Sequence, residues 1–162
     1  MASHESDLVY AGFWQRFGAY FLDGFLLYVL TFVLLLVVYG TIYLDDPSAY
    51  WGPASLVISY LVPPFLILTF WINKSATPGK MAIAATIVDA RTGGKPSTRQ
   101  FVIRYFAYGL SLLALGLGYL WIVFDARKQG WHDKLAGTVV VKRKAGAGDA
   151  VRFEAPLTGP LA

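Results

Sequence analysis

The stretch FWQRFGAYFLDGFLL, from Phe13 to Leu27, opens a long apolar segment that carries an arginine and, seven residues later, an aspartate. Seven residues are nearly two helical turns, so Arg16 and Asp23 share one helix face, about 10 Å apart along the axis. An ionised side chain in the middle of a membrane helix costs about 2.5–3.5 kcal/mol. Arg16 can reach the interface as an anchor, whereas the aspartate is too short to do so. Asp23 therefore needs a partner, either as a packing hydrogen bond or as a functional site.

The distribution of charge around this stretch predicts a membrane protein. The 162-residue chain is 56% hydrophobic and only 15% charged, whereas soluble domains average about 25% charged. No charged residue occurs over residues 24–44, 47–73 and 105–124, and each run approaches or exceeds the roughly 20 residues that cross a bilayer. We expect an all-α membrane protein with three transmembrane segments.

The rest of the chain frames these segments. We expect a polar leader over residues 1–12, one transmembrane domain over 13–144 and a disordered tail over 145–162. The leader has acidic residues where a secretory signal has basic ones, so the first helix is expected to stay in the membrane. The absence of cysteine excludes disulfides and thiolate chemistry.

Two stretches outside the apolar runs favour β-structure. MAIAATIVDA, residues 81–90, is rich in β-branched residues and is followed by the turn signal RTGG, and TVVVKRK covers residues 138–144. An isolated hairpin is marginal in water. We expect the two stretches to pair as a small cytoplasmic β element at the membrane surface.

The basic residues produce a conflict over topology. The first loop has no Lys or Arg, residues 74–104 have six, and the chain from Asp125 onward has seven. Because Lys and Arg mark cytoplasmic loops, the 74–104 loop is expected inside. Three simple crossings would place the basic tail outside, against the same rule. A re-entrant third segment, broken at Gly109, Gly116 or Gly118, would return the tail; a single crossing is the alternative that hydropathy favours.

Several further residues are candidates for a site. Asp125 ends the last apolar run and is either a solvated helix end or a buried acid. His132 and Asp133 suggest a proton relay or half a metal site, but adjacent residues rarely face one ion and the sole other histidine is His4. We therefore expect no metal, and expect Asp133 to bind nearby backbone.

The second apolar run contains Pro63 and Pro64 near its centre. A proline removes a backbone hydrogen bond and disturbs the preceding turn. Such a break is either a plain kink supported by neighbouring helices or part of a transport site. Small residues at Ala107, Ser111, Ala114 and Gly118 predict a close packing face in the third segment, within the chain or between subunits.

Four strings in this order resemble the RDD family of small, mostly bacterial, multi-pass membrane proteins: WQRFGAYFLD, TPGK, the strand-like MAIAATIVDA and VFDARKQGWHDKLAGTVVV. The family is named for an arginine at the start of the first span, an aspartate within it and an aspartate in the third. By this resemblance Arg16, Asp23 and Asp125 fill the three positions, with Asp133 the less favoured alternative for the last. The TPGK lysine lacks the context of a phosphate-binding loop.

The resemblance implies the bacterial inner membrane, and transport, including cation/proton antiport, has been proposed for members of the family. One hypothesis is a transporter for a monovalent cation or proton in which Asp23 is the site, Arg16 its partner, Asp125 a gate, and Pro63–Pro64 a hinge. Three spans enclose little space, so transport would require a homo-oligomer.

The alternative is a scaffold or accessory subunit that binds lipid or a partner membrane protein. The net charge of +4 then reflects topology and anionic lipid rather than nucleic acid. No serine–histidine, zinc or paired-acid pattern occurs at membrane depth, so we expect neither an enzyme nor a cofactor.

Overall fold

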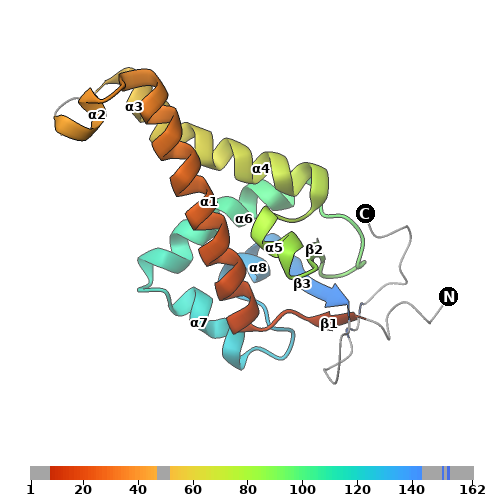
Figure 1. Ribbon diagram of the computed structural model, residues 1–162. Coiled ribbons are helices and arrows are strands. Elements are labelled where there is room, and N and C mark those ends of the chain that lie inside the picture. Colours follow the sequence, from red (N-terminus) through yellow and green to blue (C-terminus); the bar gives the residue numbers. More distant parts are fainter. Residues whose placement is uncertain (1–7, 47–51, 144–150, 152, 154–162) are drawn as a thin grey trace.

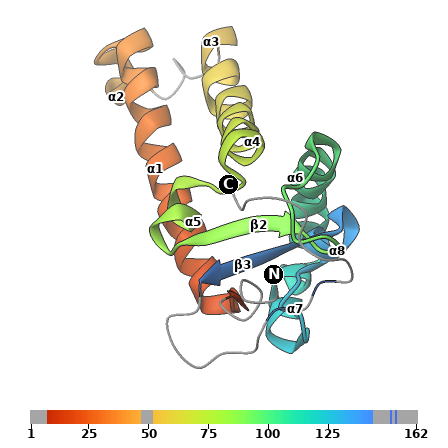
Figure 2. The ribbon, with the colours of Figure 1, turned by 90° about the vertical axis from the view of Figure 1, so that its right-hand side faces the viewer.

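The computed structural model describes residues 8–46, 52–143, 151 and 153, and shows a helical hairpin standing on a small sheet (Figures 1 and 2). The described elements are, in chain order, β1 (Leu8–Tyr10), α1 (Phe13–Tyr39), α2 (Ile42–Asp45), α3 (Pro53–Leu56), η3 (Val57–Leu61), α4 (Val62–Lys74), α5 (Pro78–Ala82), β2 (Ala85–Asp89), α6 (Thr98–Leu113), α7 (Leu117–Phe124), α8 (Trp131–Ala136) and β3 (Thr138–Arg143).

Helix α1 is the first membrane span. It is 27 residues long, and the side chain of Gln15 accepts a hydrogen bond from the Gly12 amide at its start. It ends where Gly40 takes the left-handed φ of 63°, which suits a residue without Cβ. Of its side chains only Arg16, Ala19 and Leu35 are buried, so most of this apolar helix is left for lipid.

The second span, from Pro53 to Lys74, contains a π-helical turn just before Pro63 and Pro64. Val62 donates its amide to Val57, five residues back. Pro63 and Pro64 follow in the first turn of α4, and neither has an amide hydrogen to donate to the turn before it. The wider π turn thus accommodates both prolines, and α3, η3 and α4 continue as one long apolar helix.

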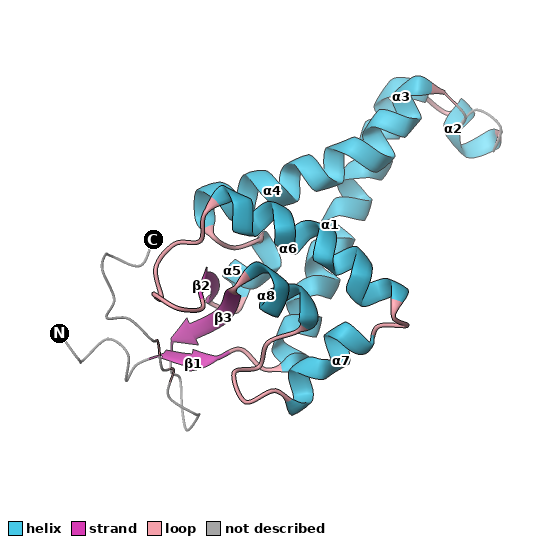
Figure 3. Ribbon diagram, turned by 180° about the vertical axis from the view of Figure 1, so that it is seen from behind, coloured by secondary structure: helices cyan, strands magenta, loops and turns pink. Residues whose placement is uncertain are grey.

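The third apolar segment is broken into α6 and α7, which meet at an angle of 99° (Figure 3). The break lies at Leu115 and Gly116, both with positive φ. Gly109 stays inside α6. Gly118, in α7, faces back to α6, where a Cβ would lie 2.5 Å from the Ser111 hydroxyl, so two members of the predicted small-residue face let the limbs approach closely.

The expected pairing of the two β-prone stretches is confirmed. β2 and β3 are antiparallel with Ile87 opposite Val140, and the sheet order is β1-β3-β2. One boundary was wrong: Met81 and Ala82 lie in α5 because the TPGK turn starts a short helix. Strand β1 was not expected, because it lies within the predicted leader; Leu8 pairs with Arg143.

The sheet has two apolar faces, as the alternation along β3 dictates. Val139 and Val141 pack in one cluster with Leu8, Val88 and Val151. Val140 faces the other way, into a cluster of Ala11, Trp71, Ala85, Ile87 and Phe101 that joins the sheet to α4 and α6. The predicted disordered tail, residues 145–162, lies outside the described residues except for Val151 and Phe153.

The sheet also fixes the path of the third segment. β2 precedes α6 and β3 follows α7, yet the two strands are hydrogen-bonded neighbours. Strands of one sheet cannot lie on opposite sides of a bilayer, so this pairing favours the re-entrant alternative over a single crossing. It also brings the basic segments on either side of α6–α7 together.

Candidate functional site

A buried cluster of two arginines and one aspartate joins three distant parts of the chain. Arg16 of α1 donates to Oδ2 of Asp133 in α8, and Arg104 of α6 lies 2.6 Å from the other carboxylate oxygen. Asp133 and Arg104 are fully buried, and Arg16 is 8% exposed. Because an ion pair away from water is screened little, each member depends strongly on the others.

Backbone and hydroxyl groups complete this cluster. Arg16 Nε donates to the Ala11 carbonyl at 2.9 Å, Arg104 to the Thr138 hydroxyl at 2.8 Å, and the Gly130 amide to Asp133 at 3.1 Å. The expected bond from Asp133 to nearby backbone is therefore present, alongside the two ion pairs. Two N–H groups, Arg16 Nη2 and Arg104 Nε, have no partner among the described residues. The cluster holds two positive charges and one negative charge.

The two guanidinium groups keep Asp133 ionised. Burial alone would raise the pKa of Asp133, but Arg104 and Arg16 outweigh it and hold that pKa well below its usual range. The neighbouring His132 behaves differently. Burial lowers the pKa of His132 to about 3, so its imidazole is neutral, stacked on Tyr108 at 4.1 Å between ring centroids.

Asp23 makes separate contacts, nearly two helical turns further along α1 than Arg16. Its carboxylate accepts hydrogen bonds from the Thr77 hydroxyl and, at 2.6 Å, from the Gly79 amide. A Cβ at Gly79 would lie 2.9 Å from the Asp23 carboxyl carbon and would overlap the Ala19 carbonyl. Only a glycine permits this approach, so the TPGK turn is fitted to the acid of the first span.

Lys80, the lysine of the same turn, is directed into the protein. It is 6% exposed, its Nζ is 3.3 Å from the Thr77 hydroxyl, and it lies 5.9 Å from the centre of the Trp71 ring. Burial lowers the pKa of Lys80, and the nearby Arg104 and Arg16 lower it further, against the opposite effects of Tyr108 and Asp23. Within the described part of the chain, no carboxylate lies within ion-pair distance of this ammonium.

These charged groups line two adjoining cavities. The first, about 390 Å³, is lined by Asp23, Lys80 and Trp71, among others. The second, about 410 Å³, is lined by Arg16, Lys80, Arg104 and His132, with apolar and aromatic residues of α1, α6 and α7. No carboxylate is among its lining residues. Lys80 lies in the wall of both.

Of the three family-signature positions, the structure therefore brings no two together. Arg16 meets Asp133, and Asp23 meets the TPGK turn. Asp125, whose side chain is 11% exposed, pairs with the more exposed Lys134 and accepts the Arg127 amide at 3.1 Å. Although burial raises the pKa of Asp125, bonds from Lys134 and from backbone amides give a net lowering. The described residues contain no group of three side chains suited to a metal.

Two residues of the site were missed from the sequence. Arg104 was counted with the basic loop, but the capping box of Ser97 and Gln100 starts α6 at Thr98. That signal places Arg104 almost two turns inside a helix, where an arginine needs a partner. Lys80 gave no such signal, because TPGK marks a turn without showing which way the lysine points.

These features define a helical multi-pass membrane protein with two or three candidate spans, a helix pair bent by 99° and a small three-stranded sheet. The chain belongs to the RDD family, whose model matches residues 10–137.

Bacterial relatives agree with this assignment. Over 135 residues the chain is 32% identical to "Uncharacterized protein YckC" of Bacillus subtilis, covering 80% of this chain and 83% of the relative. It is 27% identical to "Uncharacterized membrane protein YteJ" of the same species over 138 residues, or 83% and 82% of the two chains. A match of 40% identity to "Uncharacterized protein RP437" of Rickettsia prowazekii covers 46% of this chain and spans 41% of that relative's length. No solved structure matches.

Proposed function

We propose that this protein exchanges a small monovalent cation for a proton across the bacterial inner membrane, with Asp23 as the cation site and Lys80 as the proton carrier. The observation that supports it is the shared Thr77 hydroxyl, which contacts the Asp23 carboxylate on one side and the Lys80 ammonium on the other, in the wall of one cavity. Carboxylate, hydroxyl and carbonyl oxygens at a break between membrane helices are ligands suited to such an ion.

Charge balance gives the exchange its logic. Arg16, Arg104 and Asp133 leave one net positive charge, and Asp23, in the wall of the adjoining cavity, adds one negative charge to the region. One further positive charge can then be held, either as the proton on Lys80 or as a cation on Asp23. A second positive charge at this distance in a poorly hydrated site is unfavourable. Cation entry at Asp23 therefore favours release of the Lys80 proton, and proton entry favours release of the cation.

The same proposal orients the molecule. The sheet side carries the basic 74–104 loop and the basic segment after Asp125, so we place it in the cytoplasm. The loop between α1 and α4, which has no Lys or Arg, lies outside. A path across the membrane needs more enclosure than these few helices give, so we propose a homo-oligomer, with mass measurement in detergent as its test. Arg16 and Asp125 become positioning residues, and no catalytic role is assigned.

The experiment is flux in proteoliposomes that enclose a pH-sensitive dye, started by a sodium, potassium or lithium gradient. Asp23→Asn is expected to abolish cation-driven proton movement, whereas Asp45→Asn, the same change at an exposed acid of α2, is expected to preserve it. Lys80→Met should abolish exchange while the matched Lys74→Met does not. Unchanged flux in Asp23→Asn would overturn the assignment of Asp23.

A second function is favoured by a different observation. In the Arg16–Asp133–Arg104 cluster, the arginine of the family signature forms an ion pair that ties α1, α6 and α8 together. Such a structural role suits a non-transporting scaffold or accessory subunit. If the purified wild type moves no proton with any of the three cations, transport fails and the scaffold is retained. A partner membrane protein that copurifies in fixed ratio would support it directly.

A further inference from the structure

We propose that the second cavity binds the phosphate group of an anionic phospholipid. Its wall brings together three cationic side chains, Arg16, Lys80 and Arg104, and contains no carboxylate. The site shares Lys80 with the proposed ion exchange but not Asp23, which belongs to the other cavity, and its test needs no ion gradient.

The uneven charge is the first argument. Three cations lie near the cavity, and Asp133 behind the wall, held by Arg16 and Arg104, supplies one opposing charge. Buried positive charge is costly unless an anion compensates it. An oxyanion in the cavity would supply that compensation with charge-assisted hydrogen bonds, which are stronger than neutral ones.

The second argument is an unused donor. Arg16 is only 8% exposed, yet its Nη2 has no hydrogen-bond partner among the described residues. The Nε of Arg104 is in the same state. Buried N–H groups of native proteins are rarely left without an acceptor. Arginine presents a planar fork of donors that suits phosphate oxygens.

The third argument is the apolar rim, which distinguishes a lipid from a free ion. Phe17, Leu115 and Leu120 line the cavity and are 53%, 92% and 46% exposed. The volume of about 410 Å³ accommodates a headgroup, within the range of small-molecule sites, while acyl chains would lie along the rim outside it.

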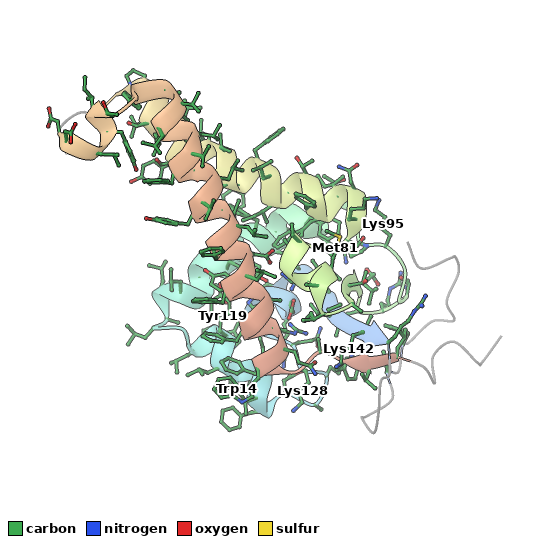
Figure 4. All side chains as sticks on the ribbon, in the orientation of Figure 1. Trp14, Met81, Lys95, Tyr119, Lys128 and Lys142 are labelled. Carbon is green, nitrogen blue, oxygen red and sulfur yellow. The ribbon has the colours of Figure 1, made fainter. Side chains whose placement is uncertain are left out.

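Depth supports the same ligand. Arg16 lies in the first turns of α1, at the end of the span that joins the sheet, and Trp14 projects outward beside it, 78% exposed (Figure 4). Exposed tryptophans gather at the level of the lipid headgroups. The cationic floor is thus at the depth where phosphates lie. The excess positive charge favours phosphatidylglycerol or cardiolipin over zwitterionic lipids.

The test is native mass spectrometry of the full chain in detergent, titrated with palmitoyl-oleoyl phosphatidylglycerol or with its phosphatidylcholine counterpart, without any ion gradient. We expect one saturable phosphatidylglycerol, bound about tenfold or more tightly than phosphatidylcholine, because the choline cation beside the same phosphate is repelled by the positively charged wall. Equal binding of the two lipids would overturn the proposal. Inorganic phosphate or oleate bound as tightly as phosphatidylglycerol would overturn the lipid assignment in favour of a free anion or a fatty acid.

Two variants separate the site from the fold. Arg16→Lys keeps the charge but loses the guanidinium fork, and is expected to weaken phosphatidylglycerol binding about tenfold. Leu120→Trp fills the mouth of the cavity without touching the ion cluster, and is expected to displace the lipid. Val123→Trp, on the same helix at 45% exposure and outside the cavity wall, is the control. If Leu120→Trp and Val123→Trp bind lipid alike, the cavity is not the site.

Discussion

Arg16 and Asp133 are 117 residues apart in sequence and form a buried ion pair between the first span and the last short helix. Arg104 holds the second oxygen of the same carboxylate. The contact ties α1, α6 and α8 together beside the pairing of β1 with β3, and it makes one acid the counter-charge of two cations. The consequences of this arrangement can be measured.

Replacing Asp133 removes the counter-charge of both arginines. Asp133→Asn is expected to lower the free energy of unfolding by about 3–5 kcal/mol, because two guanidinium groups are left buried without an anion. Unfolding in detergent followed by tryptophan fluorescence measures the change. Lys134→Met, which removes the partly exposed partner of Asp125, is expected to cost less than about 1 kcal/mol. Equal losses in the two variants would contradict a special role for the buried cluster.

The neutral state of His132 makes stability depend on pH. Because burial lowers the pKa of His132 from 6.5 to about 3, the unfolded chain binds a proton between these values while the folded chain does not. Stability therefore falls as pH drops from 6.5 toward 3, by on the order of 4–5 kcal/mol. His132→Phe keeps the stack on Tyr108 and should flatten this decline. Parallel pH profiles for the variant and the wild type would assign the decline to other groups.

The lowered pKa of Asp133, which Arg104 and Arg16 cause against the effect of burial, acts in a lower range. The stability that it contributes is present above its unfolded value of 3.8 and is lost only as pH falls below it. The effects of His132 and Asp133 on stability can therefore be distinguished in one titration by their different pH ranges.

The glycine of the TPGK turn tests the contact with Asp23. Gly79→Ala is expected to destabilise the protein by about 1–3 kcal/mol, since its Cβ would overlap the Ala19 carbonyl and crowd the Asp23 carboxyl. Gly24→Ala is the matched control, because a Cβ there meets nothing within 4 Å and alanine is the better helix former. Thermal unfolding of the two variants should move in opposite directions. A neutral Gly79→Ala would show that the turn and the first span are not held together.

The re-entrant path can be tested by labelling, because the chain has no cysteine of its own. Single variants Arg91→Cys and Lys142→Cys should react with an impermeant maleimide from the same side of the membrane, and Asp45→Cys from the opposite side. Arg91 follows β2, Lys142 lies near the end of β3, and Asp45 ends α2 beyond the first span. Labelling of Lys142→Cys from the side of Asp45→Cys would rule out the hairpin of α6 and α7.

Much of the fold was predictable because it depends on local composition. The apolar runs marked the spans, and β-branched residues marked β2 and most of β3. The topology conflict favoured a return of the third segment, and of its three candidate glycines only Gly116 lies at the break, beside Leu115. Strand β1 was hidden, since three residues such as LVY carry too little pattern to be recognised without their partner β3.

The partners of the charges were harder to predict. The spacing of seven residues predicted that Arg16 and Asp23 share a face, but which groups they meet depends on how α5, α6 and α8 fold back onto that face. Asp133 looked like a local capping residue, and indeed accepts from Gly130, yet its main contacts come from 117 and 29 positions upstream (Asp133 to Arg16 and to Arg104). Such pairings are a property of tertiary packing and leave no trace in spacing.

The strand order β1-β3-β2 places the last strand to leave the ribosome between the first two. Until β3 emerges, β1 has no neighbour, Arg16 and Arg104 have no counter-charge, and the first span lacks its tie to the sheet. The spans can enter the membrane one after another as they are made. Their final arrangement, however, requires residues 131–143, which contain Asp133 and β3, so the membrane domain is complete only after this late segment has been made.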